Sequence, residues 1–390
     1  MMTTHVFIVD VNTFKYHLEY LFAGTGAKDY FIDFNNSSNT SLKHGSENNL
    51  VGMMADSLRV RKGDFVVFYL QQNFREKVYE GKFYGIFKVK DNSSFLDNND
   101  PYQFLKNNLN KSLTFRTLIE PYEVYPKGVT EWEALDEIKQ IPAPYQMLWS
   151  LIYRKLKGNR GNTMITIYEA EKLFKLIRDK NQQKTFSGTK FTFNINKEEI
   201  EISSSIYTYS GRQESINIMP RLICKYCNNK AFEMHLQAYI VQNIGCNINQ
   251  SLDECILGGL SGLSIEWISN EVSCGVGMQR IDIMLSLIKN ITTKLILPIE
   301  LKAVEATGNN VIQIQRYIDW IEQYYISNRI SDIQPILVSK KINDKNSKMY
   351  GNVISNFTNF NQINKARCYP LNYIEYEIIN KQLQFQKIIY

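Results

Sequence analysis

The sequence predicts an α+β protein of two domains, with a small N-terminal β-barrel carrying helices and a C-terminal α/β core built on a mixed sheet. Short β-rich runs separated by turn residues dominate the first part of the chain, and helical and strand patterns alternate in the last part. A polar stretch lies between them. With 390 residues, 44% of them hydrophobic, the chain is long enough for two or three separate cores.

Four β-rich runs are expected to form the N-terminal sheet, at residues 5–11, 64–70, 82–90 and 112–119. Gly63 follows Lys62 at a predicted tight turn, and Gly85 within an aromatic run indicates a bulge or a close backbone approach. Apolar residues at helical spacing predict helices at 147–156 and 167–177. The sheet should therefore curl between flanking helices.

The segment RDKNQQKTFSGTK at 178–190 is charged and nearly free of apolar residues, which is typical of a linker. We therefore expect domains at 1–178 and 191–390, joined by a linker at 179–190. In the second domain the predicted order is a helix at 230–243, a strand pair across 263–287, a strand at 294–301, a helix at 310–325 and a strand at 334–339.

The charge and the cysteines restrict the class of protein. A net charge of +6 mildly favours an acidic partner. The six cysteines do not form a disulfide pattern, no secretory signal begins the chain and no apolar run reaches membrane-spanning length, so a cytoplasmic protein without a membrane partner is expected. Cys224 and Cys227 have zinc-knuckle spacing but lack a second pair. The glycine-rich run at 22–26 lacks the Lys-Ser/Thr of a phosphate loop, so no nucleotide cofactor is expected.

Two acidic residues and a lysine are predicted to meet on adjacent strands. Asp282 lies in GMQRIDIMLSL, and Glu300 and Lys302 lie in LILPIELKA after a polar turn. Residues two apart on a strand share a face, so Glu300 and Lys302 converge while Leu301 offers its carbonyl. Two carboxylates buried together require a cation, and hard oxygen ligands suit Mg²⁺, which Mn²⁺ can replace.

An exposed strand with a cross-strand ion pair is the alternative interpretation of this pattern. Against it, Glu300 lies in an otherwise apolar strand, where a carboxylate should face the interior or a cleft. The helix upstream brings Glu233 toward the sheet beside apolar anchors. The helix downstream places Gln313, Arg316, Tyr317 and Trp320 on one face, which offers an amide and a guanidinium to a phosphate or to a metal-bound water.

The ordered motifs E-x-x-L-Q, G-V-G-x-x-R-I-D, P-I-E-L-K and Q-x-x-R-Y-x-x-W resemble the catalytic domain of PD-(D/E)xK nucleases, most closely the NucS/EndoMS family, over about residues 231–339. The resemblance implies metal ligands at Asp282 and Glu300, a catalytic Lys302, an active-site Glu233 and a supporting Gln313. Ile281 stands where proline is usual in the motif. The N-terminal half does not resemble the NucS N-terminal domain, so mismatch specificity is not implied.

The runs R-K-G-D-x-V-V-F-Y and Y-G-I-F-x-V resemble EVE-type, PUA-like domains, over about residues 5–177. Members of that group often hold a flipped or modified base in an aromatic pocket. Tyr30, Phe34, Trp132 and Trp149 are the possible pocket residues, with ordinary core packing as the alternative for each.

A basic cluster follows, in WSLIYRKLKGNRGNT, where Arg154, Lys155, Lys157 and Arg160 surround a glycine. A helix running into a basic loop suits DNA phosphates, and a solvated helix end is the alternative.

Together these patterns predict a Mg²⁺-dependent endonuclease of restriction type, whose N-terminal domain recognises a DNA site or a modified base. A homodimer on double-stranded DNA is expected, because a double-strand cut needs two active sites and the sequence has one set of motifs. The alternatives are a mismatch or repair endonuclease like NucS and a nucleic-acid-binding protein without catalytic activity.

Overall fold

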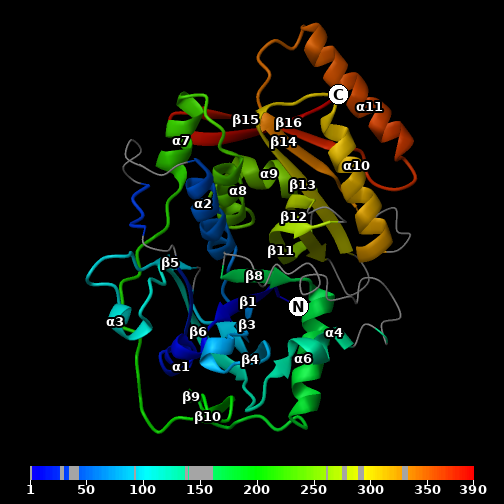
Figure 1. The fold of residues 1–390 in the computed structure, drawn as a ribbon. Coiled ribbons are helices and arrows are strands. Elements are labelled where there is room, and N and C mark those ends of the chain that lie inside the picture. Colours follow the sequence, from blue (N-terminus) through cyan, green and yellow to red (C-terminus); the bar gives the residue numbers. More distant parts are fainter. Residues whose placement is uncertain are drawn as a thin grey trace. The chain divides into compact units, whose positions relative to one another are not determined.

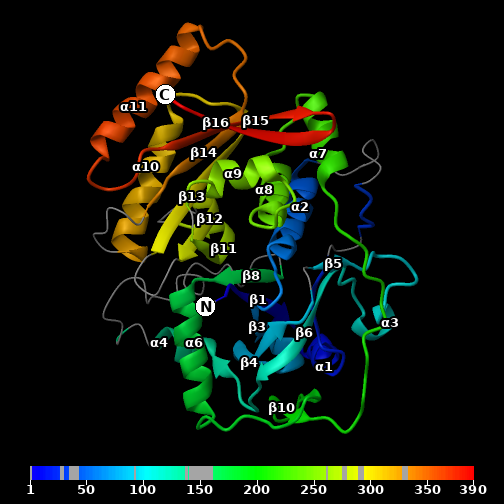
Figure 2. The same cartoon turned by 180° about the vertical axis from the view of Figure 1, so that it is seen from behind.

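The structure is a computed structural model, and its described residues form two compact units (Figures 1 and 2). The first unit holds the described residues up to Ile216 except Phe34, and the second holds Phe34 and the described residues from Asn217 to Tyr390. No described helix is long and apolar enough to cross a membrane. The described residues are 2–26, 30–34, 44–91, 94–136, 139, 161–260, 262–274, 279–288, 294–326 and 333–390.

A curled mixed sheet forms the centre of the first unit. Its main path is β2-β6-β4-β3-β1-β8, while β5 pairs with β6 and β7 with β4. The β1–β3 pair is parallel, and its neighbours β1–β8 and β3–β4 are antiparallel. The strands are β1 (Thr4–Val9), β2 (Phe22–Thr25), β3 (Phe65–Leu70), β4 (Lys82–Val89), β5 (Phe95–Leu96), β6 (Phe115–Glu123), β7 (Val129–Thr130) and β8 (Asn162–Ile165).

The four β-rich runs of the sequence all form strands, namely β1, β3, β4 and β6. The first run was predicted too long, because Val11 begins helix α1 (Val11–Glu19). Asp10 caps this helix, since its carboxylate accepts hydrogen bonds from the backbone N–H groups of Asn12 and Thr13. A capping aspartate directly after an apolar run therefore ends the strand.

Both predicted glycine positions have left-handed backbone conformations. Gly63 has φ +85° in the turn that enters β3, closed by a hydrogen bond from Asp64 N to Arg61 O. Gly85 has φ +63° in β4, and the pairing with β3 shifts register opposite it, between Val66 and Phe68. This register shift confirms the bulge predicted at Gly85. Glycine suits the position because an L side chain would be strained in this backbone conformation.

Five helical segments besides α1 lie among the described residues of the first unit. Helix α6 confirms the helix predicted at 167–177, and it begins with a capping box in which Thr166 and Glu169 exchange side-chain-to-backbone hydrogen bonds. The helix predicted at 147–156 lies outside the described residues. The segments are α2 (His44–Leu58), the 3-10 turn η1 (Phe74–Glu76), α3 (Lys106–Leu109), α4 (Glu131–Asp136) and α6 (Ile167–Lys180).

The predicted linker at 179–190 does not divide the two units. Beyond it, β9 (Phe191–Asn194) and β10 (Glu199–Ile202) form a hairpin that belongs to the first unit. Phe193 packs against Phe14 and Tyr84, with ring centroids 4.7 and 5.5 Å apart, and so completes the core of the first unit. The division falls instead between Ile216 and Asn217.

A buried ion-pair network fixes the last segment of the first unit. Arg116 and Asp97 are both fully buried, and their nearest side-chain atoms are 3.1 Å apart. Arg212 reaches the same carboxylate at 3.3 Å and binds Asp100 at 2.7 Å. Backbone hydrogen bonds between Leu96 and Glu214 run alongside. The chain is therefore tied to the sheet just before it enters the second unit.

His17 lies in the core of the same unit. It is 1% exposed, and its Nδ1–H donates to the carbonyl oxygen of Phe22 at 2.9 Å. Burial lowers the pKa of the imidazole to about 4; the hydrogen bond to Phe22 opposes this shift and the nearby Arg116 charge adds to it. The folded protein therefore holds a neutral imidazole at pH values where the unfolded chain is protonated.

Acidification is expected to destabilise the first unit through His17. Its folded pKa lies below the ordinary value of 6.5, so the stabilisation is complete above pH 6.5 and is lost as the pH falls toward 4. The loss at pH 4 is about 3 kcal/mol. Urea unfolding at pH 7 and pH 4 should show this extra loss in the wild type and not in His17→Asn, which keeps a hydrogen-bond donor. Equal losses in both proteins would contradict the assignment.

The second unit contains a six-stranded mixed sheet in the order β11-β12-β13-β14-β15-β16. The pairs β13–β14 and β14–β15 are parallel and the other three are antiparallel. The strands are β11 (Ser264–Ser273), β12 (Arg280–Ile288), β13 (Lys294–Glu305), β14 (Ile336–Lys340), β15 (Asn372–Ile379) and β16 (Gln382–Ile388). The α+β class and a mixed sheet in the C-terminal half are therefore confirmed.

Helices cover both faces of this sheet, with α8 and α9 on one side and α10 and α11 on the other (Figures 1 and 2). Every element predicted between 230 and 339 is present, including the helix at 310–325, whose last turn is a π-helix. The helical segments are α7 (Met219–Cys227), α8 (Glu233–Asn243), α9 (Gln250–Leu257), α10 (Asn310–Trp320), η5 (Ile321–Tyr325) and α11 (Lys348–Ile363).

Candidate active site

Asp282 and Glu300 lie opposite each other on neighbouring antiparallel strands. The last paired positions of β12 and β13 are Ile283 and Ile299, and the two carboxylates are one residue further on each strand. Directly opposed residues project from the same face of a sheet. Glu300 is fully buried and Lys302 is half-buried. The three side chains predicted to meet are therefore brought together.

Short contacts hold these side chains in place. The backbone N–H of Leu301 donates to Asp282 Oδ2 at 2.8 Å. Lys302 Nζ lies 2.5 Å from Glu300 Oε1, and the Tyr317 hydroxyl lies 2.5 Å from Glu300 Oε2. Each carboxylate is thus oriented by a group on β13 or α10.

Helix α8 supplies Glu233 at its first residue. Glu233 Oε1 accepts a hydrogen bond of 3.3 Å from the backbone N–H of Ala303, the residue after Lys302. One turn later Gln237 donates to the carbonyl oxygen of Asp282 at 2.8 Å. Gln237 is buried, and it joins the helix to the strand that carries Asp282. The predicted placement of Glu233 beside the sheet agrees with this geometry.

Gln313 acts through a tyrosine that the sequence interpretation did not include among the site residues. Its Nε2 donates to the Tyr317 hydroxyl at 2.7 Å, and that hydroxyl lies within hydrogen-bond distance of Glu300 Oε2 and of the Arg280 carbonyl oxygen. The i,i+4 spacing of Gln313 and Tyr317 on a helix was the signal for this pair. Arg316, between them in sequence, is exposed on α10.

The electrostatics of the cluster favour a bound cation. Burial and the neighbouring Glu300 charge raise the pKa of Asp282 well above its usual range, although the Leu301 N–H and Lys302 oppose this shift. Burial also raises the pKa of Glu300, against the effects of Lys302 and Tyr317. Two adjacent carboxylates with one lysine carry more negative charge than their surroundings stabilise.

Lys302 stays in its ammonium form. Burial disfavours the charge, but the carboxylates of Glu300, Glu233 and Asp282 outweigh it and raise the pKa of the lysine. An ammonium group donates hydrogen bonds and cannot accept a proton. The Lys302 ammonium can therefore orient a water molecule but cannot deprotonate it.

The donor atoms fit a hard divalent cation. Glu300 Oε1 is buried and accepts no hydrogen bond of ordinary geometry from the described residues, although the Lys302 ammonium lies close to it. Within the described part of the chain no three His, Cys, Asp or Glu side chains cluster closely enough to hold a metal ion. A metal here would therefore depend on Asp282, Glu300 and the Leu301 carbonyl, with waters as further ligands, as Mg²⁺ prefers.

The other predicted site residues lie in different parts of the chain, some of them outside the described residues. Trp132 is 62% exposed on α4, Tyr30 is half-buried in the first unit, and Phe34 is buried but belongs to the second unit. Trp149 and the predicted DNA-binding residues Arg154, Lys155, Lys157 and Arg160 lie outside the described residues.

Comparisons with known proteins leave the family open. No family model matches the chain. No curated protein matches it either. Among solved structures, a hypothetical protein from Leishmania major is 12% identical with a TM-score of 0.29, covering 47% of this chain and 98% of its own. Human THYN1, solved in complex with 5-methylcytosine-containing DNA, is 11% identical with a TM-score of 0.23. The match covers 45% of this chain and 95% of the THYN1 chain. Similarities at this level do not establish a shared fold.

Proposed function

We propose that this protein is a Mg²⁺-dependent endonuclease of restriction type that hydrolyses phosphodiester bonds in double-stranded DNA. The observation that carries the proposal is the convergence of Asp282, Glu300 and Lys302 on one sheet face, with both carboxylates held by specific hydrogen bonds. Two carboxylates and a lysine ammonium are suited to a metal ion and a phosphate diester.

Each residue has a defined part in this proposal. Asp282, Glu300 and the Leu301 carbonyl would hold Mg²⁺, which supplies stabilisation of the negative charge that develops on the phosphate. The Lys302 ammonium donates to the attacking water or to a phosphate oxygen. Gln313 and Tyr317 keep the Glu300 carboxylate in one orientation. Glu233 adds negative charge at the rim of the site, where it is exposed.

We extend the proposal to the first unit as the part that recognises a DNA site or a modified base. Its support is the resemblance of the Arg61–Tyr69 and Tyr84–Val89 runs to EVE-type domains. Those runs form β3 and most of β4 at the centre of the curled sheet. A homodimer belongs to the same proposal, because a double-strand cut needs two active sites.

Digestion of methylated and unmethylated phage DNA with the full-length protein and Mg²⁺ tests the proposal. Discrete bands are expected for the wild type and for Lys348→Ala, a matched control at an exposed lysine of α11. Lys302→Ala should lower the cleavage rate at least about 100-fold, as loss of one preorganised donor does in other active sites. EDTA should stop cleavage and Mn²⁺ should restore it.

The methylation dependence of the bands would identify what the first unit recognises. Cleavage at the wild-type rate by Lys302→Ala would refute the site. Cleavage confined to mispaired duplexes would move the function to mismatch repair, and heteroduplex oligonucleotides are the substrates that separate these two activities. Absence of cleavage on every DNA, with binding retained, would indicate a nucleic-acid-binding protein.

A further inference from the structure

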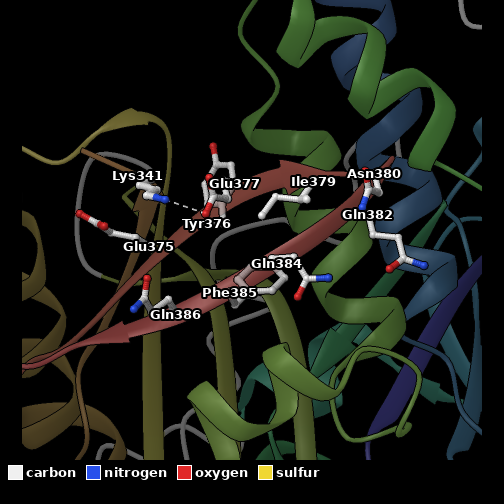
Figure 3. A pocket seen from close by; sticks show the side chains of 10 residues that line it. All are labelled: Lys341, Glu375, Tyr376, Glu377, Ile379, Asn380, Gln382, Gln384, Phe385 and Gln386. Carbon is white, nitrogen blue, oxygen red and sulfur yellow. Dashed lines mark hydrogen bonds and ion pairs between the residues drawn. The ribbon is translucent and has the colours of Figure 1, made fainter. Parts of the chain in front are cut away.

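A groove of about 420 Å³ lies on the β15–β16 hairpin of the second unit (Figure 3). Amide side chains line β16 and the hairpin turn, namely Asn380, Gln382, Gln384 and Gln386. All four are exposed, and none makes a side-chain hydrogen bond within the described part of the chain. Their donors and acceptors are therefore available to a ligand.

The groove and the candidate active site share one face of the sheet. Glu300 pairs with Leu337, Leu337 with Tyr373, and Tyr373 with Ile388. Paired residues project from the same face, and so do residues two apart on a strand. Gln386 and Gln384, two and four residues before Ile388, therefore face the same way as Glu300.

The charges around the groove suit an anionic partner. Glu377 and Glu375 project into this face from β15, but Lys341 binds Glu377 at 2.8 Å and Lys345 forms an ion pair with Glu375. Figure 3 shows the Lys341–Glu377 contact on the groove wall. Both acidic groups are thus neutralised. Lys381 is exposed in the hairpin turn and adds an uncompensated positive charge at its end.

The end of the hairpin is a two-stranded ribbon, because β14 pairs with β15 only as far as Tyr376. Its strands pair from Tyr373–Ile388 to Ile379–Gln382 without a register shift. The two turn residues, Asn380 and Lys381, have φ values of 51° and 62°, typical of a tight two-residue turn. The major groove of DNA admits a ribbon of this kind, and glutamine amides pair with the N6 and N7 atoms of adenine there.

From these observations we infer that the β15–β16 groove binds the major-groove edge of DNA and reads bases beside the cleavage position through Gln382, Gln384 and Gln386. Successive glutamines are two residues apart, or roughly 6.8 Å along a strand. Two base-pair steps along the DNA axis also span roughly 6.8 Å. Neighbouring glutamines in this row therefore contact base pairs that are two steps apart. Adenine is the favoured base at each of these positions.

The distance to the active site gives the position of the contacts. Three strand spacings separate β13 from β16, and the glutamines are offset along the strand, so they lie roughly 16–25 Å from Glu300. This distance corresponds to roughly five to seven base pairs. The position of these contacts relative to a cleaved bond rests on the proposed nuclease function. The base contacts themselves do not depend on catalysis.

The test uses the full-length chain carrying Asp282→Asn, so that the DNA is not cut, and a pool of randomised DNA duplexes. Bound duplexes are recovered and sequenced for this protein, for the same protein with Gln382→Ala and Gln384→Ala, and for a matched control with Gln362→Ala on α11. The starting protein and the control are expected to enrich the same adenine-containing positions. The double glutamine variant should lose this preference by about tenfold or more.

Two results would overturn the inference. In the first, the starting protein enriches no DNA sequence. In the second, the double glutamine variant enriches the same sequences as the starting protein and has the same thermal midpoint as the control. Cleavage assays of the corresponding proteins with Asp282 intact separate the two proposals. A wild type that selects DNA sequences through these glutamines but cuts no DNA would refute the nuclease and support the groove. Cutting with an identical site pattern in the double glutamine variant would support the nuclease and refute the groove.

Discussion

Replacement of Asp282 by asparagine is expected to lower the Mg²⁺-dependent cleavage rate by about 1000-fold or more, the size of effect seen when charge stabilisation at a reacting phosphate is lost. Asparagine has nearly the same shape and keeps an oxygen for the Leu301 N–H, which donates to Asp282 at 2.8 Å. What it removes is one negative charge beside Glu300. Initial rates of plasmid nicking across a Mg²⁺ titration measure the effect.

Folding is expected to be unaffected by this change. The Asp282 charge is buried next to a second carboxylate, a pairing that opposes folding in the absence of a cation. The thermal midpoint of Asp282→Asn without Mg²⁺ should therefore equal or exceed that of the wild type. A lower midpoint together with lost activity would indicate damage to the fold, and retained cleavage would refute the metal assignment.

Replacement of Arg116 by methionine is expected to lower the free energy of unfolding of the first unit by about 3–5 kcal/mol. Arg116 and its partner Asp97 are both fully buried, so the change leaves an interior carboxylate whose remaining cation partner, Arg212, is 3.3 Å away and only partly buried. It also removes hydrogen bonds to the carbonyls of Leu113 and Phe104, at 2.6 and 2.8 Å. Urea unfolding measures the loss, and hydrogen exchange of β2 and β6 peptides assigns it to the first unit.

A matched control and a double variant isolate the buried charge as the cause. Arg178→Met breaks the more exposed ion pair with Glu123 and should cost no more than about 1 kcal/mol. Adding Asp97→Asn to Arg116→Met should recover part of the loss, because the buried charge that Arg116 neutralised is then gone. A double variant less stable than Arg116→Met would contradict this explanation.

The meeting of Asp282, Glu300 and Lys302 was predictable because it follows from strand alternation and the pairing of two consecutive strands. In LILPIELKA the apolar positions fix which residues face the core, and Glu300 then projects beside Asp282 of the neighbouring strand. The role of Tyr317 was not predictable in this way. It depends on the rotation of α10 against the sheet, which brings one hydroxyl within 2.5 Å of a buried carboxylate.

The division between the units was predicted in the wrong place because a polar segment need not be a linker. The residues after Lys180 have few apolar side chains, but Phe191 and Phe193 on β9 fill a core that residues far upstream build. Helix α11 was missed for a related reason. Its glycine and asparagines have low helix propensity, and packing of Val353, Phe357 and Phe360 at helical spacing stabilises it.

The series of neighbouring strands from β13 through β14 and β15 to β16 has a consequence for how specificity could be altered. Side chains at the two ends of this series are separated by backbone hydrogen bonds, which substitutions of side chains leave in place. In a nuclease that reads bases on the hairpin, exchanging the glutamines would change which sequence is chosen but not how far from it the cut falls. Sequence preference and cut position are then separate, independently adjustable properties of one sheet.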